Sequence, residues 1–272
     1  MKVNFRSLSA LRVLLTTCLL LIAGLMWAQS PSPLSKPLLT TGADEWTLAW
    51  SEEFDGPDAA LDAKWKSQNG PSTHILSSRW RENVVVTNSL LRLLARKEKR
   101  GGQDWTAGSI WTRETFQYGY FECRYRYAGA EGLNNSFWLM PTSTNQVTQG
   151  KLFEIDVNEG HYPNKIANNI HNHSDVTVIN GKRTHPTASR TFTYKDQDFA
   201  RDFQVHGLEW NERELIFYLN GKEIRRVKNE FCLSPAPVWL SLAVIPWAGR
   251  VTDAIDGTAM EVDYVRIYRA KP

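Results

Sequence analysis

Residues 151–160 read KLFEIDVNEG, a short apolar strand pattern that also carries three acids. Hydrophobic side chains alternate along it from residue 153 to residue 157, as they do in a strand with one buried face. The acids are Glu154, Asp156 and Glu159. A core strand has no need of three carboxylates, so the stretch is either a charged sheet edge or part of a catalytic site.

The spacing of the acids decides which of them share a face. Successive side chains of a strand point to opposite faces, so Glu154 and Asp156 point the same way. Glu159 lies an odd number of positions from Glu154, and a regular strand would turn it to the other face. A β-bulge adds one residue and restores the alternation, and residues 158–160 are the expected place for it. With that bulge, all three carboxylates project from one face.

The chain around this stretch reads as a series of short strands. No helical pattern of ten or more residues interrupts them. Two Asn-Gly pairs, Asn180-Gly181 and Asn220-Gly221, are typical of two-residue hairpin turns. Many strands, tight turns and no crossover helices predict an all-β fold, an antiparallel two-sheet β-sandwich. The expected strands cover residues 47–50, 83–87, 90–96, 118–127, 135–140, 152–159, 203–210, 214–219, 238–244 and 260–268.

The N-terminal residues have the layout of a secretory signal. Basic residues precede an apolar run over residues 13–27, and small residues follow it, so we expect a signal peptide over residues 1–28. A single membrane anchor is the alternative, because the run is near the lower limit for spanning a bilayer. Residues 29–43, rich in Pro, Ser and Thr, predict a flexible leader. One folded domain is then expected over residues 44–272.

Charge and cysteine content restrict the function further. The first 28 residues hold three basic and no acidic side chains, so the formal +3 of the whole chain leaves the remainder near neutral. A near-neutral domain lacks the basic face of a nucleic-acid binder. We expect an exported protein, secreted or periplasmic, that is a monomer without stable membrane association after signal cleavage. Cys123 and Cys232 are either one disulfide or a pair of buried thiols.

Aromatic content favours a carbohydrate ligand. Ten Trp residues follow the expected signal. Aromatic rings fill cores, but flat rings also stack on the apolar faces of sugars. Retaining glycoside hydrolysis needs two carboxyl groups about 5 to 5.5 Å apart, one ionised and one protonated, and crowded acids help to keep one protonated. An acidic strand edge that discourages sheet pairing is the alternative, but three aligned acids in an exported, Trp-rich β-protein favour catalysis.

The stretch Glu154-Ile155-Asp156-Val157-Asn158-Glu159 resembles the signature of glycoside hydrolase family 16 in its bulged form, E-x-D-x-x-E. The resemblance implies a concanavalin-like jelly roll with a concave substrate cleft and a glycoside hydrolase catalytic domain over residues 44–272. It implies Glu154 as nucleophile, Glu159 as acid/base and Asp156 as their assistant, hydrogen-bonded to the nucleophile, with no cofactor for catalysis. Further segments in the family's order are LAWSEEFDG at 48–56, YGYFECRYRY at 118–127, SFWLM at 136–140, FQVHGLEW at 203–210, IFYLNGKEI at 216–224 and VDYVRIY at 262–268.

The resemblance also bears on the substrate, a polysaccharide. The bulged form is similar to β-1,3-glucanases (laminarinases) and to the agarase, porphyranase and carrageenase group, and differs from the lichenase and xyloglucan branches. Asn134 stands where the β-1,3-glucanases commonly carry a cleft Trp. The sequence therefore favours an algal galactan of agar, porphyran or carrageenan type, with β-1,3-glucan as the alternative.

Four residues are expected to bind substrate in such a cleft. Trp138 and Trp247 are candidates for stacking on sugar rings, with core packing as the alternative for Trp138. Asn135 and His171 are candidates for hydrogen bonds to sugar hydroxyls. His171 and His173 also have an acceptable metal-ligand spacing, although no further ligand is evident in the sequence.

Charged residues elsewhere suggest two accessory roles. Members of the family often hold a structural calcium away from the cleft, and Glu53 with Asp263 are the expected metal ligands here. Guanidinium groups match sulfate geometry well, so Arg79, Arg81 and Arg113 are either sulfate donors or ordinary surface.

Two rival functions share the expected fold. A non-catalytic carbohydrate-binding jelly roll is possible on fold alone, but a lectin has no use for paired Glu residues on a bulged strand. A transglycosylase would share the covalent intermediate and differ only in whether water or a sugar intercepts it.

Overall fold

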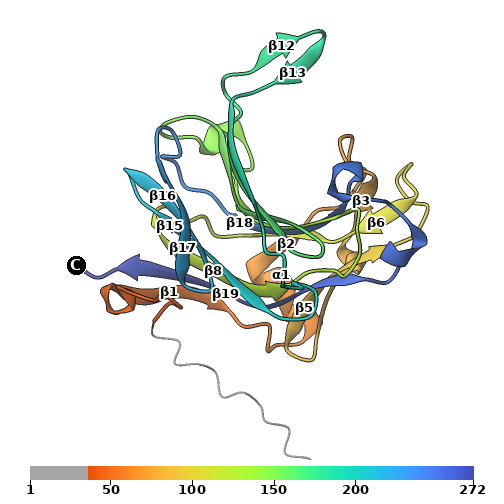
Figure 1. Cartoon of the computed structure of the whole chain (residues 1–272), viewed down its shortest axis with the longest axis horizontal. Helices are drawn as coiled ribbons and strands as arrows, with labels where there is room; N and C mark the ends of the chain where they lie inside the picture. The colour runs from red at the N-terminus through yellow and green to blue at the C-terminus, as the bar shows by residue number, and fades with distance from the viewer. Residues whose placement is uncertain (1–35) are drawn as a thin grey trace, which may run out of the picture. The chain divides into compact units, whose positions relative to one another are not determined.

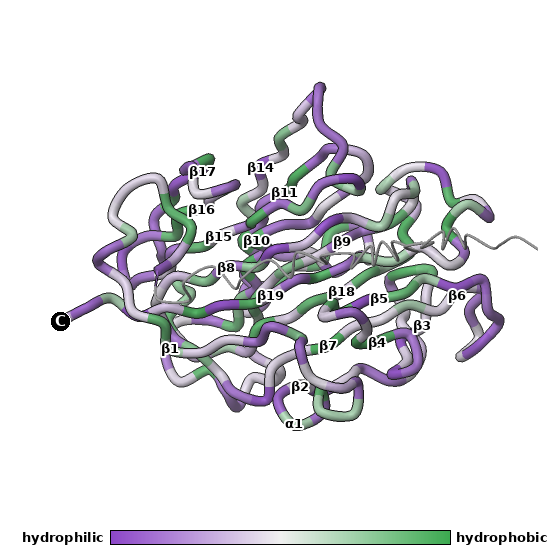
Figure 2. Tube along the Cα trace, turned by 90° about the horizontal axis from the view of Figure 1, so that it is seen from below, coloured by the Kyte–Doolittle hydropathy of each residue, from purple (hydrophilic) through white to green (hydrophobic). Residues whose placement is uncertain are grey.

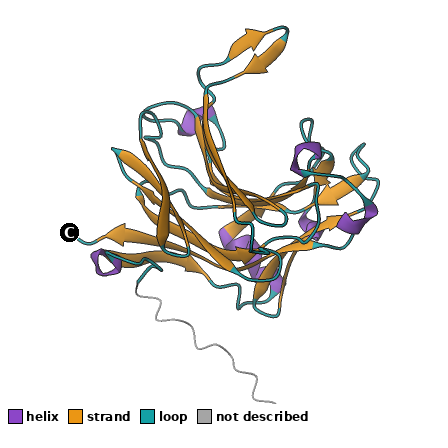
Figure 3. Ribbon diagram, viewed as in Figure 1, coloured by secondary structure: helices purple, strands orange, loops and turns teal. Residues whose placement is uncertain are grey.

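The structure, a computed structural model, describes residues 36–272 and consists mainly of strands (Figure 3). The secretory signal expected over residues 1–28 and the first part of the expected leader lie outside the described residues. Two large sheets pack one over the other (Figure 1). The sandwich expected from the sequence is therefore confirmed.

The larger sheet has ten strands, and eight of them follow the order β17-β16-β15-β8-β19-β5-β6-β3, while β1 pairs with β19 and β4 with β5. All its pairings are antiparallel except β3 with β6. Its strands are β1 (Trp46–Glu52), β3 (Ser77–Arg79), β4 (Val84–Thr87), β5 (Leu90–Arg96), β6 (Trp105–Ala107), β8 (Gly119–Arg126), β15 (Gln204–Trp210), β16 (Glu214–Leu219), β17 (Lys222–Lys228) and β19 (Ala259–Ala270).

The smaller sheet has seven antiparallel strands in the order β14-β11-β10-β9-β18-β7-β2. These are β2 (Trp65–Ser67), β7 (Ser109–Thr112), β9 (Leu133–Leu139), β10 (Phe153–His161), β11 (Lys165–Asn172), β14 (Thr187–Thr193) and β18 (Val238–Val244). A separate hairpin of β12 (Thr177–Ile179) and β13 (Lys182–Thr184) projects away from this sheet (Figure 1).

Helical structure is minor in the described part of the chain. One α-helix, α1 (Leu61–Lys64), leads into β2. The remaining turns are 3₁₀ segments: η1 (Ala43–Glu45), η2 (Asp58–Ala60), η3 (Arg81–Asn83), η4 (Thr144–Gln146), η5 (Pro246–Ala248) and η6 (Asp253–Ile255). None of the described helices has the length and apolar content needed to cross a bilayer.

The core lies between the two sheets because each sheet turns an apolar face inward. Phe153, Ile155 and Val157 of β10 are buried there, as the sequence pattern predicts, and so are Phe121 and Cys123 of β8. The alternation of hydrophobic and hydrophilic residues along the strands is visible in Figure 2. Alternation of this kind leaves the opposite face of β10 free to carry polar groups.

Both predicted hairpin turns are present. Asn220 and Gly221 join β16 to β17 with φ of 49° and 76°, and Asn180 and Gly181 join β12 to β13 with φ of 50° and 75°. Positive φ at both positions is the requirement of a type I′ turn, which Asn-Gly meets at low cost.

The leader differs from the expected flexible linker over its described part, residues 36–43. The Leu38 amide donates to Glu122 Oε2 at 2.9 Å, and the Tyr268 hydroxyl donates to the Lys36 carbonyl at 3.2 Å. Thr40 donates its amide to the Gly221 carbonyl at 3.1 Å. These residues pack on the ten-stranded sheet, so the folded unit begins before residue 44.

The cysteine alternatives are also resolved by the fold. Cys123 and Cys232 are both buried, and neither is in a disulfide. Burial raises the pKa of both thiols, which keeps them protonated and unreactive.

Candidate active site

A bulge in β10 brings the three acids onto one face. Opposite β9, Asp156 pairs with Trp138 and Asn158 pairs with Phe137, so two steps on β10 match one step on β9. The register with β11 shifts over the same interval, between Asp156 and Glu159. The bulge therefore lies at residues 157–158, slightly before the expected 158–160, with the predicted effect on Glu159.

Polar contacts from both sheets hold the bulge. Asn158 is fully buried, and its Nδ2 donates to the hydroxyls of Tyr125 and Tyr127, the latter at 2.8 Å. Asn168 of β11 donates its Nδ2 to the Val157 carbonyl at 2.6 Å. Bulged backbone loses its regular ladder partners, and these side chains replace them.

Gly160 is required directly after the acids because of the same tyrosine. A Cβ at this position would lie 2.3 Å from Tyr127 Cζ. Any side chain there would displace the ring whose hydroxyl contacts Asn158, and with it the bulge.

Two asparagines connect the acids to neighbouring strands. Asn169 of β11 donates its Nδ2 to Asp156 Oδ2 at 3.1 Å and to Glu159 Oε2 at 2.6 Å. Asn134 of β9 donates to Glu159 Oε1, and its own buried Oδ1 has no partner among the described residues. Glu159 is thus held at both oxygens.

The environment favours protonated forms of two of the acids. Burial, followed by the negative charge of Asp156, raises the pKa of Glu159. Burial, followed by the charge of Glu154, raises the pKa of Asp156. A carboxyl group that keeps its proton near neutral pH meets the requirement of a general acid.

A histidine contacts Glu154. His173 Nε2 lies 2.7 Å from Glu154 Oε2, whereas Asp156 Oδ2 is occupied by Asn169 and His171. The hydrogen bond expected between Asp156 and the nucleophile stays a prediction. Glu154 Oε1 has no hydrogen-bond partner among the described residues.

His171 is expected to hydrogen-bond sugar hydroxyls, but in the structure its ring nitrogens lie against other protein side chains. Its Nε2 is 3.1 Å from Asp156 Oδ2, and its Nδ1 is within reach of His185 Nε2 at 3.1 Å and Thr187 Oγ1 at 2.8 Å. Burial disfavours its charged form, but the hydrogen bond and charge of Asp156 raise its pKa. Both ring nitrogens face protein groups, so His171 orients Asp156 rather than presenting a free nitrogen to a sugar.

Three tryptophans form a row beside the acids. Trp138 of β9 stacks on Trp239 of β18, and Trp239 stacks on Trp111 of β7, with ring centroids 4.6 Å apart in both pairs. This separation is close to the spacing of neighbouring strands, about 4.7–4.9 Å, because the three residues are direct cross-strand partners. We call these residues the tryptophan row. Asp156 is the cross-strand partner of Trp138, so the row begins at the acids.

Asn135 and Trp247, the other two expected substrate contacts, differ in their exposure. Asn135 is fully buried, with its amide bonded to Ala128 N and the Gly160 carbonyl, so it cannot touch a substrate. Its neighbour Asn134 points to the acids instead, since alternate residues of β9 face opposite ways. Trp247 in η5 is 60% exposed and stays a predicted stacking residue.

The expected calcium ligands are engaged elsewhere. Glu53 forms a two-bond ion pair with Arg266 at 3.0 and 2.8 Å, and Asp263 pairs with Arg124. Within residues 36–272, the one group of three potential metal ligands is Glu154, Asp156 and His171, whose donor atoms lie within 4.8 Å of one another. Glu53 and Asp263 are thus each paired with an arginine, and the structural calcium expected beside them stays a prediction.

Comparison with known proteins places this geometry in a family. The model described as Glycosyl hydrolases family 16 matches residues 73–266. The chain belongs to glycosyl hydrolase family 16. It is accordingly a glycosidase, which hydrolyses O-glycosyl bonds.

Relatives of this family 16 hydrolase differ in their substrates. A β-glucanase of Rhodothermus marinus is 28% identical over 263 residues, covering 84% of this chain and 86% of that protein. A kappa-carrageenase of Pseudoalteromonas carrageenovora is 25% identical over 289 residues, covering 92% and 70% respectively.

Solved structures of the family have the same fold. A non-specific endo-β-1,3(4)-glucanase from family GH16 superposes with a TM-score of 0.71 at 26% identity, over 89% of this chain and 99% of that one. The endo-β-1,3-glucanase of Pyrococcus furiosus gives a TM-score of 0.70 at 25% identity, over 83% and 95%. The jelly roll is thus shared across the family's glucanases.

Several residues of the family 16 site were not predicted from the sequence. Asn169 contacts two acids, yet it carries no motif, and only its pairing opposite Asp156 reveals it. His185 reaches the site from the segment after β13, where its ring lies 4.3 Å from that of His173. The sequence does not place Trp111 and Trp239 in the site, because their stacking depends on the order of the strands in the sheet.

Proposed function

We propose that the chain is an endo-acting, retaining β-glycosidase that cleaves an algal galactan of agar, porphyran or carrageenan type by double displacement. The observation that carries the proposal is the bulge at residues 157–158, which aligns Glu154, Asp156 and Glu159 on one face. Two carboxyl groups on one face, one ionised and one protonated, are the apparatus of retaining glycoside hydrolysis.

Each group has a defined task in this mechanism. Glu154 attacks the anomeric carbon with Oε1 while His173 holds Oε2, and a glycosyl-enzyme forms. Glu159, whose pKa burial and Asp156 raise, gives its proton to the departing glycosidic oxygen. It then takes a proton from the water that hydrolyses the intermediate. Asp156 is fixed beside Glu159 by Asn169 and His171, and when it is ionised its charge adds to the effect of burial on the pKa of Glu159.

The galactan preference rests on the surroundings of the acid. Asn134, which stands where family β-1,3-glucanases commonly have a Trp, donates to Glu159. A polar side chain at this position suits a sugar whose hydroxyl points toward the sheet. It is less suited to a sugar that presents a flat apolar ring face there. The kappa-carrageenase among the relatives supports the same class.

Endo-hydrolysis of β-1,3-glucan is the second candidate function. It is favoured by the β-glucanase of Rhodothermus marinus and by the endo-β-1,3-glucanase of Pyrococcus furiosus among the relatives. Both candidates use the same acids. We also propose that the protein is exported, in keeping with the secretory pattern of residues 1–28.

Reducing-end release by the purified protein tests the proposal on agarose, porphyran, carrageenans, laminarin and lichenan. We expect cleavage of one galactan and none by Glu154→Gln. Cleavage of laminarin alone would replace the galactan assignment and keep the catalytic one. Proton NMR of the first products should show the retained anomer, and an inverted anomer would exclude double displacement. Binding without turnover by the unaltered protein would indicate a carbohydrate-binding module.

A further inference from the structure

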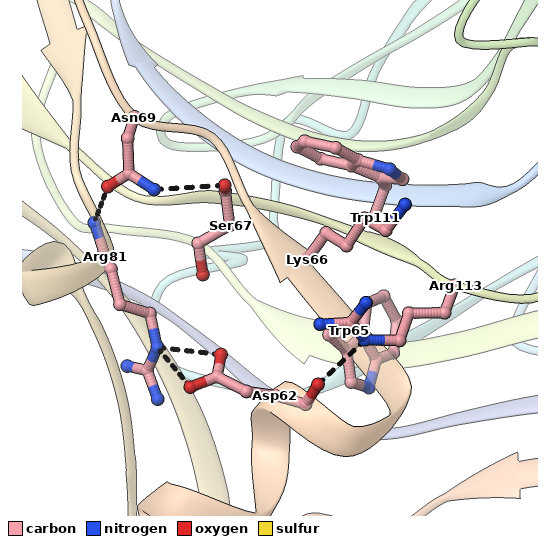
Figure 4. A pocket seen from close by; sticks show the side chains of 8 residues that line it. All are labelled: Asp62, Trp65, Lys66, Ser67, Asn69, Arg81, Trp111 and Arg113. Atoms are coloured by element: carbon pink, nitrogen blue, oxygen red, sulfur yellow. Dashed lines mark hydrogen bonds and ion pairs between the residues drawn. The ribbon is translucent and has the colours of Figure 1, made fainter.

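A surface pocket lies at the far end of the tryptophan row, away from the acids. Trp111, the last ring of the row, lines it together with residues of β2 and of the segment that leads into it (Figure 4). Its volume is about 350 Å³, within the range of 300 to 1,000 Å³ found for ligand pockets. The pocket and the catalytic acids are three strands apart, roughly 14 Å at the usual strand spacing.

Stacking within the row leaves one ring face open to this pocket. Trp239 lies in the middle, so both of its faces are covered by its neighbours. Trp111 has Trp239 on one side only, and its cross-strand partner on the other side is Lys66 of the edge strand β2. The outer face of Trp111 is therefore available for a flat ligand, and Figure 4 shows Lys66 beside it.

Two cations of the pocket have no ion-pair partner among the described residues. Lys66 is exposed and forms no salt bridge there. Arg113 is also exposed, and the one side-chain hydrogen bond that it forms within residues 36–272 runs from Nε to the backbone carbonyl of Asp62 at 2.8 Å. The third cation, Arg81, is neutralised by Asp58 and Asp62 at 3.0 and 3.1 Å.

The position of Asp62, the one acid that lines the pocket, increases the excess of positive charge near Trp111. The Asp62 carboxylate is turned to Arg81, while Arg113 donates only to the uncharged backbone carbonyl of the same residue (Figure 4). The pocket thus has an excess of positive charge on the side of Trp111. Arg79, by contrast, is buried and donates to the carbonyls of Gly108 and Leu242, so it takes no part.

We infer that this pocket is a distal subsite for a sugar ring that stacks on Trp111 and carries an anionic substituent bound by Lys66 and Arg113. The inference deepens the proposed function and rests on it, because it makes the polysaccharide an anionic one. A sulfate ester and a uronate carboxylate share the required chemistry, negative oxygens that accept charge-assisted hydrogen bonds.

The first experiment compares the protein with the double variant Lys66→Gln/Arg113→Gln on a sulfated galactan and on the same galactan after desulfation. We expect the KM for the sulfated chain to rise about tenfold, in line with the loss of charge-assisted hydrogen bonds at an exposed site. We expect kcat, and both constants for the desulfated chain, to stay unchanged. The matched control is Lys228→Gln/Arg269→Gln, which removes two exposed cations from the ten-stranded sheet.

A second experiment is independent of turnover and of the galactan assignment. Calorimetric titration of Glu154→Gln, with and without the two pocket substitutions, uses sulfated, desulfated and uronate-containing oligosaccharides. Selective loss of sulfated or of uronate binding supports the subsite and identifies the anion. Equal loss for charged and neutral sugars, or no loss, overturns it. If the enzyme proves to cleave only neutral glucan, this titration still decides whether the pocket binds an anionic sugar.

Discussion

Two halves of the seven-stranded sheet contribute to the site in different ways. Over β10, β11 and β14 this face holds carboxylates, amides and imidazoles that are linked by hydrogen bonds. Over β9, β18 and β7 the same face holds the tryptophan row, whose main contacts are ring on ring. The acid half positions individual atoms through a distorted strand, whereas the tryptophan half provides a surface through regular strand spacing. Changes to the first should therefore affect kcat, and changes to the second should affect KM.

Removal of the acid should have the largest effect on the acid half. We expect Glu159→Gln to lower kcat by about 10²- to 10⁴-fold, the usual contribution of a general acid. An aryl glycoside whose leaving group needs no proton should lose much less in the first step. Equal losses on natural and activated substrates would remove Glu159 from the role of acid.

Loss of the anchor of the bulge should have the next largest effect. Asn158→Ala leaves the Tyr125 and Tyr127 hydroxyls without their amide donor, so we expect a cost of about 1–3 kcal/mol in the free energy of unfolding. Displacement of Glu159 should also lower kcat by about 10²-fold. Denaturant unfolding and steady-state kinetics measure the two effects.

A suitable control for this change is Asn145→Ala in the exposed segment η4. It should leave both quantities unchanged. A stable Asn158→Ala protein with full activity would show that the bulge holds without its tyrosine contacts.

The pH dependence should shift in opposite directions for two neighbours of Glu159. After burial, the charge of Asp156 is the main cause that raises the pKa of Glu159, while the charge of His171 lowers it. Because Glu159 must be protonated, activity is lost as pH rises through its pKa. Asp156→Asn should therefore move the alkaline limb of kcat/KM to lower pH, and His171→Asn should move it to higher pH. Shifts in the same direction would contradict this electrostatic account.

The tryptophan half should respond more weakly. Trp239→Leu removes the middle ring, and each aromatic pair contributes about 0.5–1.5 kcal/mol beyond its buried area. We expect the KM for long oligosaccharides to rise roughly 3- to 10-fold with kcat nearly unchanged, measured by steady-state kinetics. A fall in kcat without a change in KM would show that the row supports the acids rather than the substrate.

The two halves also differ in how far the sequence predicted them. The acids, their common face and the need for a bulge follow from one six-residue motif, since strand alternation is a local rule. The bulge still lies slightly earlier than expected, because Asn158 finds its partners on a strand of the other sheet. The sequence pattern favours Asn135 as a substrate contact, but Asn134 is the residue that contacts Glu159. Neighbouring residues of a strand point to opposite faces, so an error of one residue places the side chain on the wrong face of the sheet. The tryptophan row requires the register of strands about a hundred residues apart, which no local pattern contains.

Residues that reach the site from outside the regular strands were the hardest to predict. His173 and His185 flank the β12–β13 hairpin, and their positions depend on how that excursion returns to the sheet. The docking of residues 36–43 likewise depends on Glu122, a buried acid whose partner at Leu38 is far away in the sequence. Long-range partners of this kind are set by the assembled sheets.

The tryptophan row has an optical consequence. Indole transitions at a centroid separation of 4.6 Å couple to one another, so we expect the three rings to give a paired signal in circular dichroism. A sugar bound against Trp111 would change the local polarity at one end of the row. The circular dichroism signal of the tryptophan row should therefore report sugar binding in the unaltered protein, without a label.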